Sequence, residues 1–133
     1  MFWSKTKVIF DTNFLLIPGK FGVDVFRKAG EVMDESHELC VFDATLEELQ
    51  RLMQESNGDD SFNAKLGYIM SKKKNLKTLD SSTTYADKAI LEYAKENPDS
   101  TVVATQDKEL IKKLDDLSVR TIGLRQEKNL MIR

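Results

Sequence analysis

Four acidic residues from distant parts of the chain stand in similar positions next to predicted strands and helices. Asp11 directly follows the apolar run at 8–10, and Asp107 comes shortly after another apolar run. Glu48 and Asp87 are predicted in the first turns of helices that follow two further strands. The chain has one histidine and one cysteine. A set of carboxylates without histidine or cysteine partners suits a hard cation such as Mg²⁺ or Mn²⁺.

A hard divalent cation held by carboxylates, with no covalent nucleophile nearby, is typical of phosphoryl chemistry. Such a metal lowers the pKa of a bound water and stabilises charge on phosphate oxygens. The sequence lacks the glycine-rich GxxxxGK[ST] loop of nucleoside triphosphatases. We therefore expect hydrolysis of a phosphodiester by a metal-activated water, with the four acids as metal ligands directly or through water.

A purely structural explanation of these acids is also open. Thr45-x-x-Glu48 and Thr84-x-x-Asp87 both match the capping-box pattern of helix starts. Acids in the first turn of a helix are favoured by its dipole in any case, and Asp11 is suited to capping the turn that follows it. This explanation treats the shared position of the four acids as coincidence. The two interpretations can coexist, because helix amino termini help to keep neighbouring carboxylates ionised.

The spacing of apolar residues predicts strands that alternate with helices along the chain. The expected strands are 7–10, 39–42, 75–79, 101–104 and 119–122, with an edge strand over 130–132 as one interpretation of the tail. The expected helices are 22–35, 46–53, 62–74, 84–96 and 107–115, with a break at Pro18-Gly19 and a loop at 56–60. This alternation predicts a single three-layer α/β domain over residues 1–133, with a parallel sheet covered on both faces. The carboxyl ends of parallel strands share one edge, so the four acids are expected to meet there.

The charged residues are distributed unevenly along a chain whose net charge is −2. Acids dominate residues 31–60, whereas residues 61–80 are rich in lysine. Two interpretations of the basic residues stay open: contacts to an RNA backbone, or a solvated helix end favoured by the dipole. The residues concerned are Lys72, Lys73, Lys74 and Lys77.

Cys40, the single cysteine, lies in the apolar run at 39–42 and is expected to be a buried, unreactive thiol. One cysteine cannot form an intramolecular disulfide, which favours an intracellular setting. The sequence has no apolar run of about 18 residues and no long apolar stretch of the kind found in signal peptides. We therefore expect a cytoplasmic protein without a membrane segment.

Four segments around these acids resemble the PIN-domain ribonucleases, and most closely the branch that holds VapC-type toxins and the small-subunit pre-rRNA-processing nuclease. The segments are 8–13, 46–49, 84–87 and 103–110, in the order of the family and at nearly its spacing. The resemblance implies an α/β fold with about five parallel strands in the order 3-2-1-4-5 and helices on both faces. It also implies Mg²⁺ or Mn²⁺ dependence, cleavage of single-stranded RNA and a homodimer.

The same resemblance implies which residues form the site. The metal ligands and catalytic residues would be Asp11, Glu48, Asp87 and Asp107, with Asn13 and Thr105 as polar supports. Two positions depart from the common pattern: Gln106 stands where many members carry asparagine, and Lys88 where many carry a second acid. Neither departure removes one of the four acids, although Lys88 lowers the local negative charge.

The leading hypothesis is a metal-dependent endoribonuclease, acting as the toxin of a toxin–antitoxin pair or in rRNA processing. Its expected partners are single-stranded RNA, an antitoxin or a ribosome-assembly partner, and a second copy of the chain. One alternative is an RNA- or protein-binding scaffold without turnover, against which the presence of all four acids argues. Another is a receiver-like or haloacid-type phosphotransfer domain, but the residues after Asp11 do not match the Asp-x-Asp-x-Thr pattern of haloacid-type enzymes.

Overall fold

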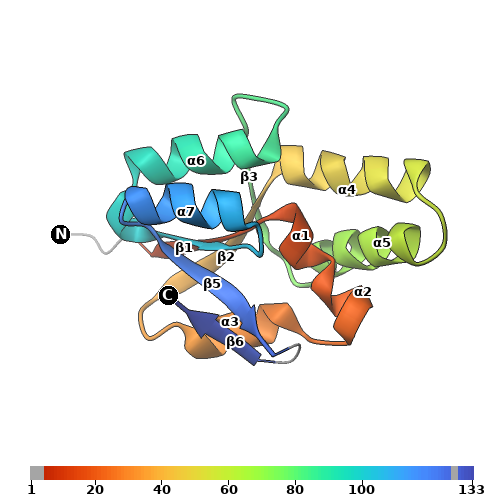
Figure 1. Ribbon diagram of the computed structural model, residues 1–133, viewed down its shortest axis with the longest axis horizontal. Coiled ribbons are helices and arrows are strands. Elements are labelled where there is room, and N and C mark those ends of the chain that lie inside the picture. The colour runs from red at the N-terminus through yellow and green to blue at the C-terminus, as the bar shows by residue number, and fades with distance from the viewer. Residues whose placement is uncertain (1–4, 127–128) are drawn as a thin grey trace.

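The computed structural model describes residues 5–126 and 129–133, which form a sheet between layers of helices (Figure 1). The strands are β1 (Thr6–Phe10), β2 (His37–Phe42), β3 (Lys77–Leu79), β4 (Thr101–Ala104), β5 (Arg120–Arg125) and β6 (Asn129–Ile132). The helices are α1 (Thr12–Leu15), α2 (Ile17–Phe21), α3 (Val25–Val32), α4 (Asp43–Glu55), α5 (Gly58–Lys73), α6 (Ala86–Glu96) and α7 (Lys108–Asp116), with a 3-10 turn, η1, at Pro98–Ser100. The predicted domain limits, 1–133, include residues 1–4 and 127–128, which lie outside the described residues.

The strands form one sheet in the order β3-β2-β1-β4-β5-β6. The first five are parallel, which confirms the expected order 3-2-1-4-5. The sheet is mixed rather than purely parallel, because β6 pairs antiparallel with β5 at the edge. The tail of the chain, for which an edge strand at 130–132 was one interpretation, thus forms the edge strand β6. The order also differs from the 2-1-3-4-5 order of receiver domains, so the fold does not support that alternative.

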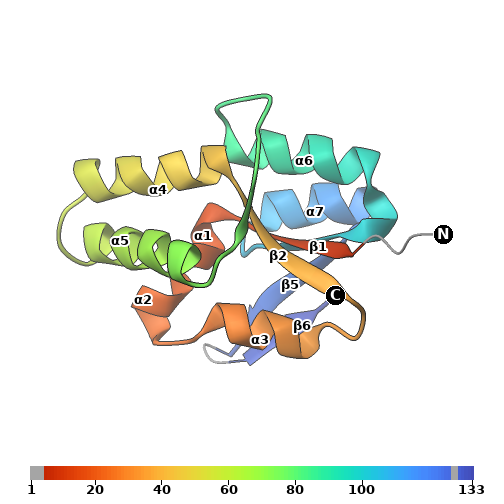
Figure 2. The same ribbon diagram turned by 180° about the vertical axis from the view of Figure 1, so that it is seen from behind.

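The two faces of the sheet bury different sets of side chains because neighbouring residues of a strand point to opposite faces. Val8 and Phe10 of β1 pack with residues of α1 to α5, whereas Ile9 packs with residues of α6 and α7. Figure 2 shows the α4–α5 hairpin beside the sheet and α3 running below it. The central strand is therefore buried on both faces, as its continuous apolar run predicts.

Two connections differ from the expectations drawn from local sequence. The chain continues through Pro18-Gly19 as helix α2, with the proline in the first turn, where its missing N–H costs no hydrogen bond. This helix ends at Gly22, whose φ of 66° is favoured by glycine. The expected loop at 56–60 is shorter, because α5 already begins at Gly58.

The α5 helix approaches α1 very closely at Gly67. A Cβ atom added there would lie 2.3 Å from the backbone oxygen of Leu15. Glycine therefore permits the contact that holds α5 against α1, the helix that directly follows β1. No helix among the described residues combines the length and the apolar character needed to cross a membrane.

Candidate active site

The site lies at the carboxyl edge of the sheet, next to the central strand β1. This strand has β2 on one side and β4 on the other, so the chain order changes direction there. Open α/β sheets bind ligands in the crevice outside the carboxyl ends of such strands. Asp11 follows β1 directly, and its backbone N–H donates to the carbonyl of Ala104 at the end of β4 at 2.9 Å. Figure 1 shows the first turns of α4, α6 and α7 converging close to α1.

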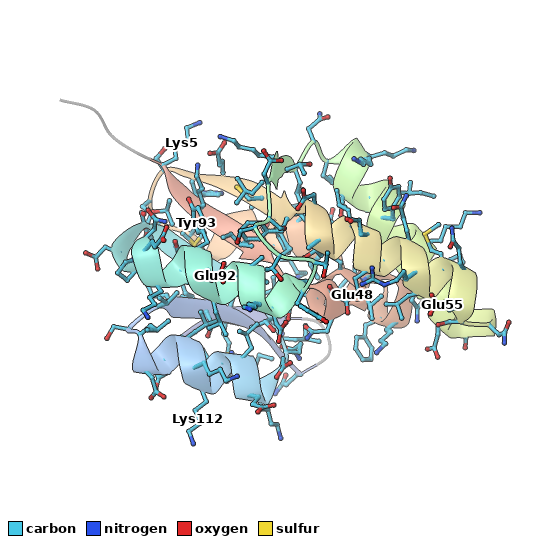
Figure 3. All side chains as sticks on the ribbon, turned by 90° about the horizontal axis from the view of Figure 1, so that it is seen from above. Lys5, Glu48, Glu55, Glu92, Tyr93 and Lys112 are labelled. Carbon is cyan, nitrogen blue, oxygen red and sulfur yellow. The ribbon has the colours of Figure 1, made fainter. Side chains whose placement is uncertain are left out.

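A cavity of about 390 Å³ opens at this point. It is lined by Asp11, Thr12, Asn13, Leu16, Glu48, Leu52, Asp87 and Asp107. Figure 3 shows Glu48 next to α1 and the N-terminal end of α6, whereas Glu55 lies at the far end of α4. The structure thus brings together all four acids named from the sequence, each from a different segment of the chain.

Asp11 is the most enclosed of the four acids, with 5% of its surface exposed. Its carboxylate accepts hydrogen bonds from the backbone N–H of Thr12 at 2.9 Å and from the Thr105 hydroxyl at 2.8 Å. The Asn13 amide donates to it at 3.1 Å. Burial raises the pKa of Asp11 above its ordinary value, the hydrogen bonds from Thr105 and Thr12 oppose this shift, and the charges of Glu48 and Asp107 add to it.

Asn13 links this carboxylate to the segment that precedes α7. Its side-chain oxygen accepts from the backbone N–H of Gln106 at 2.9 Å. The side-chain oxygen of Gln106 in turn accepts from the backbone N–H of Leu124 at 2.8 Å, which ties the segment to β5. Thr105 is fully buried and also accepts from the backbone N–H of Asp107 at 3.1 Å. Asn13 and Thr105 therefore connect Asp11 to Asp107.

Glu48 lies one turn further into its helix than the sequence suggests. The α4 helix begins at Asp43, so Thr45 is inside the helix and does not cap it. The Thr45 hydroxyl is buried and has no hydrogen-bond partner in the described part of the chain. The Glu48 carboxylate instead accepts from the hydroxyl of Thr12. The capping-box explanation of Glu48 is therefore wrong.

Thr12 is a site residue that sequence reasoning missed. It stands between Asp11 and Asn13 in the first motif, so its polar character was a usable signal. Its contact with Glu48 spans 36 residues of sequence, however, and no local pattern predicts such a pairing.

Asp87 and Asp107 both stand at helix starts, but only one of them acts as a cap. Asp107 accepts from the backbone N–H groups of Glu109 at 2.9 Å and Leu110 at 3.1 Å at the start of α7. Asp87 lies in the first turn of α6 and is exposed, and among the described residues it accepts only from the adjacent N–H of Lys88 at 2.9 Å. Thr84 precedes the N-cap residue of α6, so the predicted capping box does not form here either.

The residues of the cavity fit a hydrated hard cation. No group of three ligating side chains among the described residues is drawn together tightly enough to enclose an ion. Mg²⁺ does not require such an enclosure, because it keeps several waters and uses one or two carboxylates. Acidic side chains that face one cavity, one of them with a raised pKa caused in part by its neighbours, form a donor set that a divalent cation would neutralise.

The other residues singled out from the sequence lie outside this cavity. Cys40 is buried, and burial raises the pKa of its thiol to about 11, in line with the expected unreactive cysteine. Lys74 forms an ion pair with Asp24 at 3.2 Å, and Lys77 lies 3.7 Å from Glu38. None of the lysines at 72–74 and 77 lines the cavity, and their contact with RNA stays a prediction.

Comparison with known proteins finds one matching family model and a related protein of known name. The family model described as "PIN like domain" matches residues 8–127. Ribonuclease VapC4 of Methanocaldococcus jannaschii is 34% identical over 122 residues, which cover 92% of each chain.

Two solved structures share the fold. The PIN domain endonuclease Utp24 superposes with a TM-score of 0.79 at 20% identity, over 96% of this chain and 90% of the other. A domain of a functionally unknown protein from Methanocaldococcus jannaschii gives a TM-score of 0.57 at 17% identity, over 90% and 91%.

Proposed function

The chain belongs to the PIN-like domain family, and on this premise we propose that it is a metal-dependent endoribonuclease that hydrolyses single-stranded RNA. The observation that carries the proposal is the cavity lined by four carboxylates from four segments at the carboxyl edge of the sheet. The relative at 34% identity is named as a ribonuclease, which supports the same activity. No observation favours a scaffold without turnover, because every acid of the expected set is present and faces the cavity.

Asp11, Glu48, Asp87 and Asp107 would hold Mg²⁺ or Mn²⁺, directly or through water. When bound, such a cation lowers the pKa of water and neutralises charge on the phosphate oxygens. The side chains around the acids fix their positions beforehand. Asp11 is held by three donors, and Thr12 holds Glu48. Preorganised groups of this kind need little rearrangement when charge develops in the transition state.

The four acids differ in accessibility, which suggests different tasks. Asp11 is buried at the inner end of the cavity, whereas Asp87 and Asp107 are exposed at its rim. The exposed carboxylates are positioned to contact solvent and an incoming phosphodiester through the bound cation. The buried charge of Asp11 would be stabilised most by a bound cation, because little water reaches it.

We propose that the biological role is that of a toxin with an antitoxin partner, acting in the cytoplasm as a homodimer. This role agrees with the name of the relative at 34% identity. A role in rRNA processing with a ribosome-assembly partner is the second proposal, and it rests on the resemblance of the four sequence segments to that branch of the family. An antitoxin reading frame next to the gene would favour the first.

The direct test is incubation of the purified protein with labelled single-stranded RNA. We expect cleavage in Mn²⁺ or Mg²⁺, loss of cleavage in excess EDTA, and recovery when the metal is restored. The reason is that the carboxylate cavity offers no histidine or thiol for a metal-free route. Cleavage that persists after complete chelation would show that the proposal is wrong.

A further inference from the structure

A second hollow, of about 410 Å³, lies between α7 and the β5–β6 hairpin. Its lining comes from α7, from Val119 and Thr121 around the start of β5, and from Arg133 directly after β6. Leu130 and Ile132 of β6 point into the core on the α3 side. Met131, which lies between them, therefore points to the α7 side, where 39% of its surface is exposed. This hollow is called the α7 groove below.

The charged side chains that line the α7 groove are mostly cationic, although the whole chain has a net charge of −2. Three cations line it, Lys108, Lys112 and Arg133, against one acid, Asp115. In the part of the chain that the structure describes, none of the three forms an ion pair. Arg133 donates one hydrogen bond to the Thr121 hydroxyl at 3.2 Å. The groove thus holds cationic donors that remain available to an anion.

Two of these cations lie close to each other on one face of α7, with Asp115 as the acid that shares the groove. Lys108 and Lys112 are four residues apart on α7, so their side chains share one face of the helix. Like charges at this spacing destabilise a helix. Figure 3 shows Lys112 extending outward from α7, away from α6. A ligand with repeated negative charges would remove the repulsion.

The linings of the α7 groove and of the carboxylate cavity contain two residues that are adjacent in sequence. Lys108 lines the groove, and Asp107, the residue before it, lines the cavity. A nucleic acid strand with one phosphodiester at the carboxylates can therefore continue along α7. The carboxylates themselves offer no cationic contact to the phosphates on either side of the one at the bound metal, so cations close to the cavity would help to hold the strand there.

Three of the four lysines at 72–74 and 77, all except Lys73, have a partner in the described part of the chain that makes them less available. Lys74 and Lys77 are engaged with Asp24 and Glu38. Lys72 lies over the ring of Tyr68, with its amino group 5.7 Å from the ring centre. The cations of the α7 groove have no such partners among the described residues.

We infer that the α7 groove binds the phosphate backbone of the RNA strand next to the bond that is cut, with Lys108, Lys112 and Arg133 as the contacting cations. The inference rests on the proposed ribonuclease function and extends it. Cationic side chains that contact phosphates do not distinguish bases. The α7 groove therefore contributes affinity and positioning of the strand, and any sequence preference must arise at other contacts.

The test measures binding of a fluorescent single-stranded RNA at several salt concentrations, in Mg²⁺ and in an Asp87→Asn background that prevents cleavage. For single strands, each phosphate that a cation of the protein neutralises contributes about 0.7 to the slope of log K against log salt. The Lys108→Ala/Lys112→Ala variant should therefore bind more weakly, with a slope smaller by about 1.4. In the active background the same change should raise KM more than it lowers kcat.

The chain offers a matched control on the same helix. Lys113 is adjacent to Lys112, carries the same charge and does not line the groove. Lys113→Ala should keep the parental slope, whereas Lys112→Ala should have a slope smaller by about 0.7. Lys112→Arg should restore the binding. Equal urea midpoints for these exposed variants would exclude unfolding as the cause.

The outcomes distinguish this inference from the proposed function. If the wild-type chain cleaves RNA but Lys108→Ala/Lys112→Ala keeps the parental slope and KM, the α7 groove does not bind the substrate and the inference is wrong. A reduced slope confined to Lys72→Ala/Lys73→Ala would overturn it in favour of the α5 lysines. If the wild-type chain neither binds nor cleaves RNA under any metal condition, the proposed function is wrong and the inference falls with it.

Discussion

Asp11 and Asp87 differ strongly in burial and in hydrogen bonding. Asp11 is buried and accepts hydrogen bonds from three different residues. An ionised carboxylate accepts hydrogen bonds and donates none. An asparagine at the same position would place its NH₂ group, which is a donor, against some of these donors. Asp87 is exposed and, within the described part of the chain, accepts only from its neighbour in sequence. Replacement of Asp87 by Asn therefore tests function with less structural disturbance than the same change at Asp11.

Thr12→Val tests whether Glu48 must be held in place. The change removes the hydroxyl that donates to Glu48 while keeping a branched side chain. Because Glu48 is only partly buried and stays hydrated, we expect a loss of about 0.5–1.5 kcal/mol in the free energy of unfolding. The rate of RNA cleavage should fall by more than this loss explains. Urea unfolding and initial cleavage rates provide the comparison.

Thr12→Ser is the matched control, because serine keeps the donor and loses only a methyl group. We expect it to retain most of the cleavage rate. Cleavage by Thr12→Val at the wild-type rate would mean that the contact between Thr12 and Glu48 has no part in the reaction.

At the scale of the elements, the contact between α5 and α1 requires glycine at position 67, although alanine is usually preferred over glycine inside a helix. Glycine inside a helix usually costs up to about 1 kcal/mol relative to alanine. Gly67→Ala should nevertheless lower the free energy of unfolding, because the new Cβ would lie 2.3 Å from the Leu15 carbonyl oxygen. The displaced α1 carries Thr12 and Asn13, so cleavage should fall as well. Urea unfolding with a cleavage assay measures both effects.

Gly30 in α3 is the control for this prediction. A Cβ added there would meet only the His37 ring nitrogen, at an ordinary 3.7 Å. Gly30→Ala should therefore stabilise the protein by up to about 1 kcal/mol and leave cleavage unchanged. If both alanine variants shift stability in the same direction, the close packing of α5 on α1 is not what requires Gly67.

The segment before β2 is fastened to β5 by a pair of charged residues. Arg120 donates to the Glu35 carboxylate through two nitrogens, at 2.9 and 2.7 Å, and the Thr6 hydroxyl donates to it at 2.8 Å. The Arg120 hydrogen bonds, followed by that of Thr6, lower the pKa of Glu35 from 4.5 to about 2. Both charged side chains are about 40% exposed, so the contribution at neutral pH is at most about 1 kcal/mol.

This pair predicts a specific pH dependence of stability. Because the pKa of Glu35 is lower in the folded state, its stabilisation is present above about pH 4.5 and is lost as the pH falls towards about 2. Glu35→Gln should be less stable than wild type at pH 7 and should lose less stability across that acidic range. Urea unfolding at a series of pH values decides the matter. Parallel curves for the two proteins would contradict the assignment to Glu35.

Most helices and strands were predictable from apolar spacing, whereas their starts depended on less regular signals. Asp59 and Asp60 stand in the first turn of α5, where the helix dipole favours acids. Because residues 56–58 are typical of turns, the sequence predicted a loop up to residue 60 instead of a helix that begins at Gly58. Glu48 was placed in a first turn because Thr45 resembles a cap, but α4 begins at Asp43, three residues before the expected start at residue 46. At the observed start, the Asp43 carboxylate accepts from the backbone N–H groups of Ala44 and Ser81, and the second of these contacts could not be read from local sequence.

For the whole molecule, the alternation of strands and helices predicted a parallel sheet and the family resemblance implied its strand order, but neither predicted the contacts within the site. Each acid was recognisable by its place after a strand, and the parallel order brings all four to one edge. The contact of Thr12 with Glu48 and that of Gln106 with Leu124 join segments that only the packed structure brings together. The antiparallel β6, and with it the α7 groove, depends on a tail whose short apolar pattern was ambiguous.

The central claim is that the four carboxylates form one metal site, and binding of Mn²⁺ to the folded protein tests it without knowledge of the RNA that is cut. A ligand at 100 times its Kd stabilises the folded state by about 2.7 kcal/mol. Urea unfolding of wild type, Asp87→Asn and Asp99→Asn is measured with and without Mn²⁺. Asp99 provides the control, since it is also exposed but belongs to η1, before β4.

We expect Asp87→Asn without metal to match the stability of wild type within about 0.5 kcal/mol, because its side chain has no long-range partner among the described residues. Wild type and Asp99→Asn should gain stability with Mn²⁺, and Asp87→Asn should lose most of that gain together with cleavage. A full Mn²⁺ gain in Asp87→Asn, or no gain in wild type, would contradict the claim that these acids form one metal site.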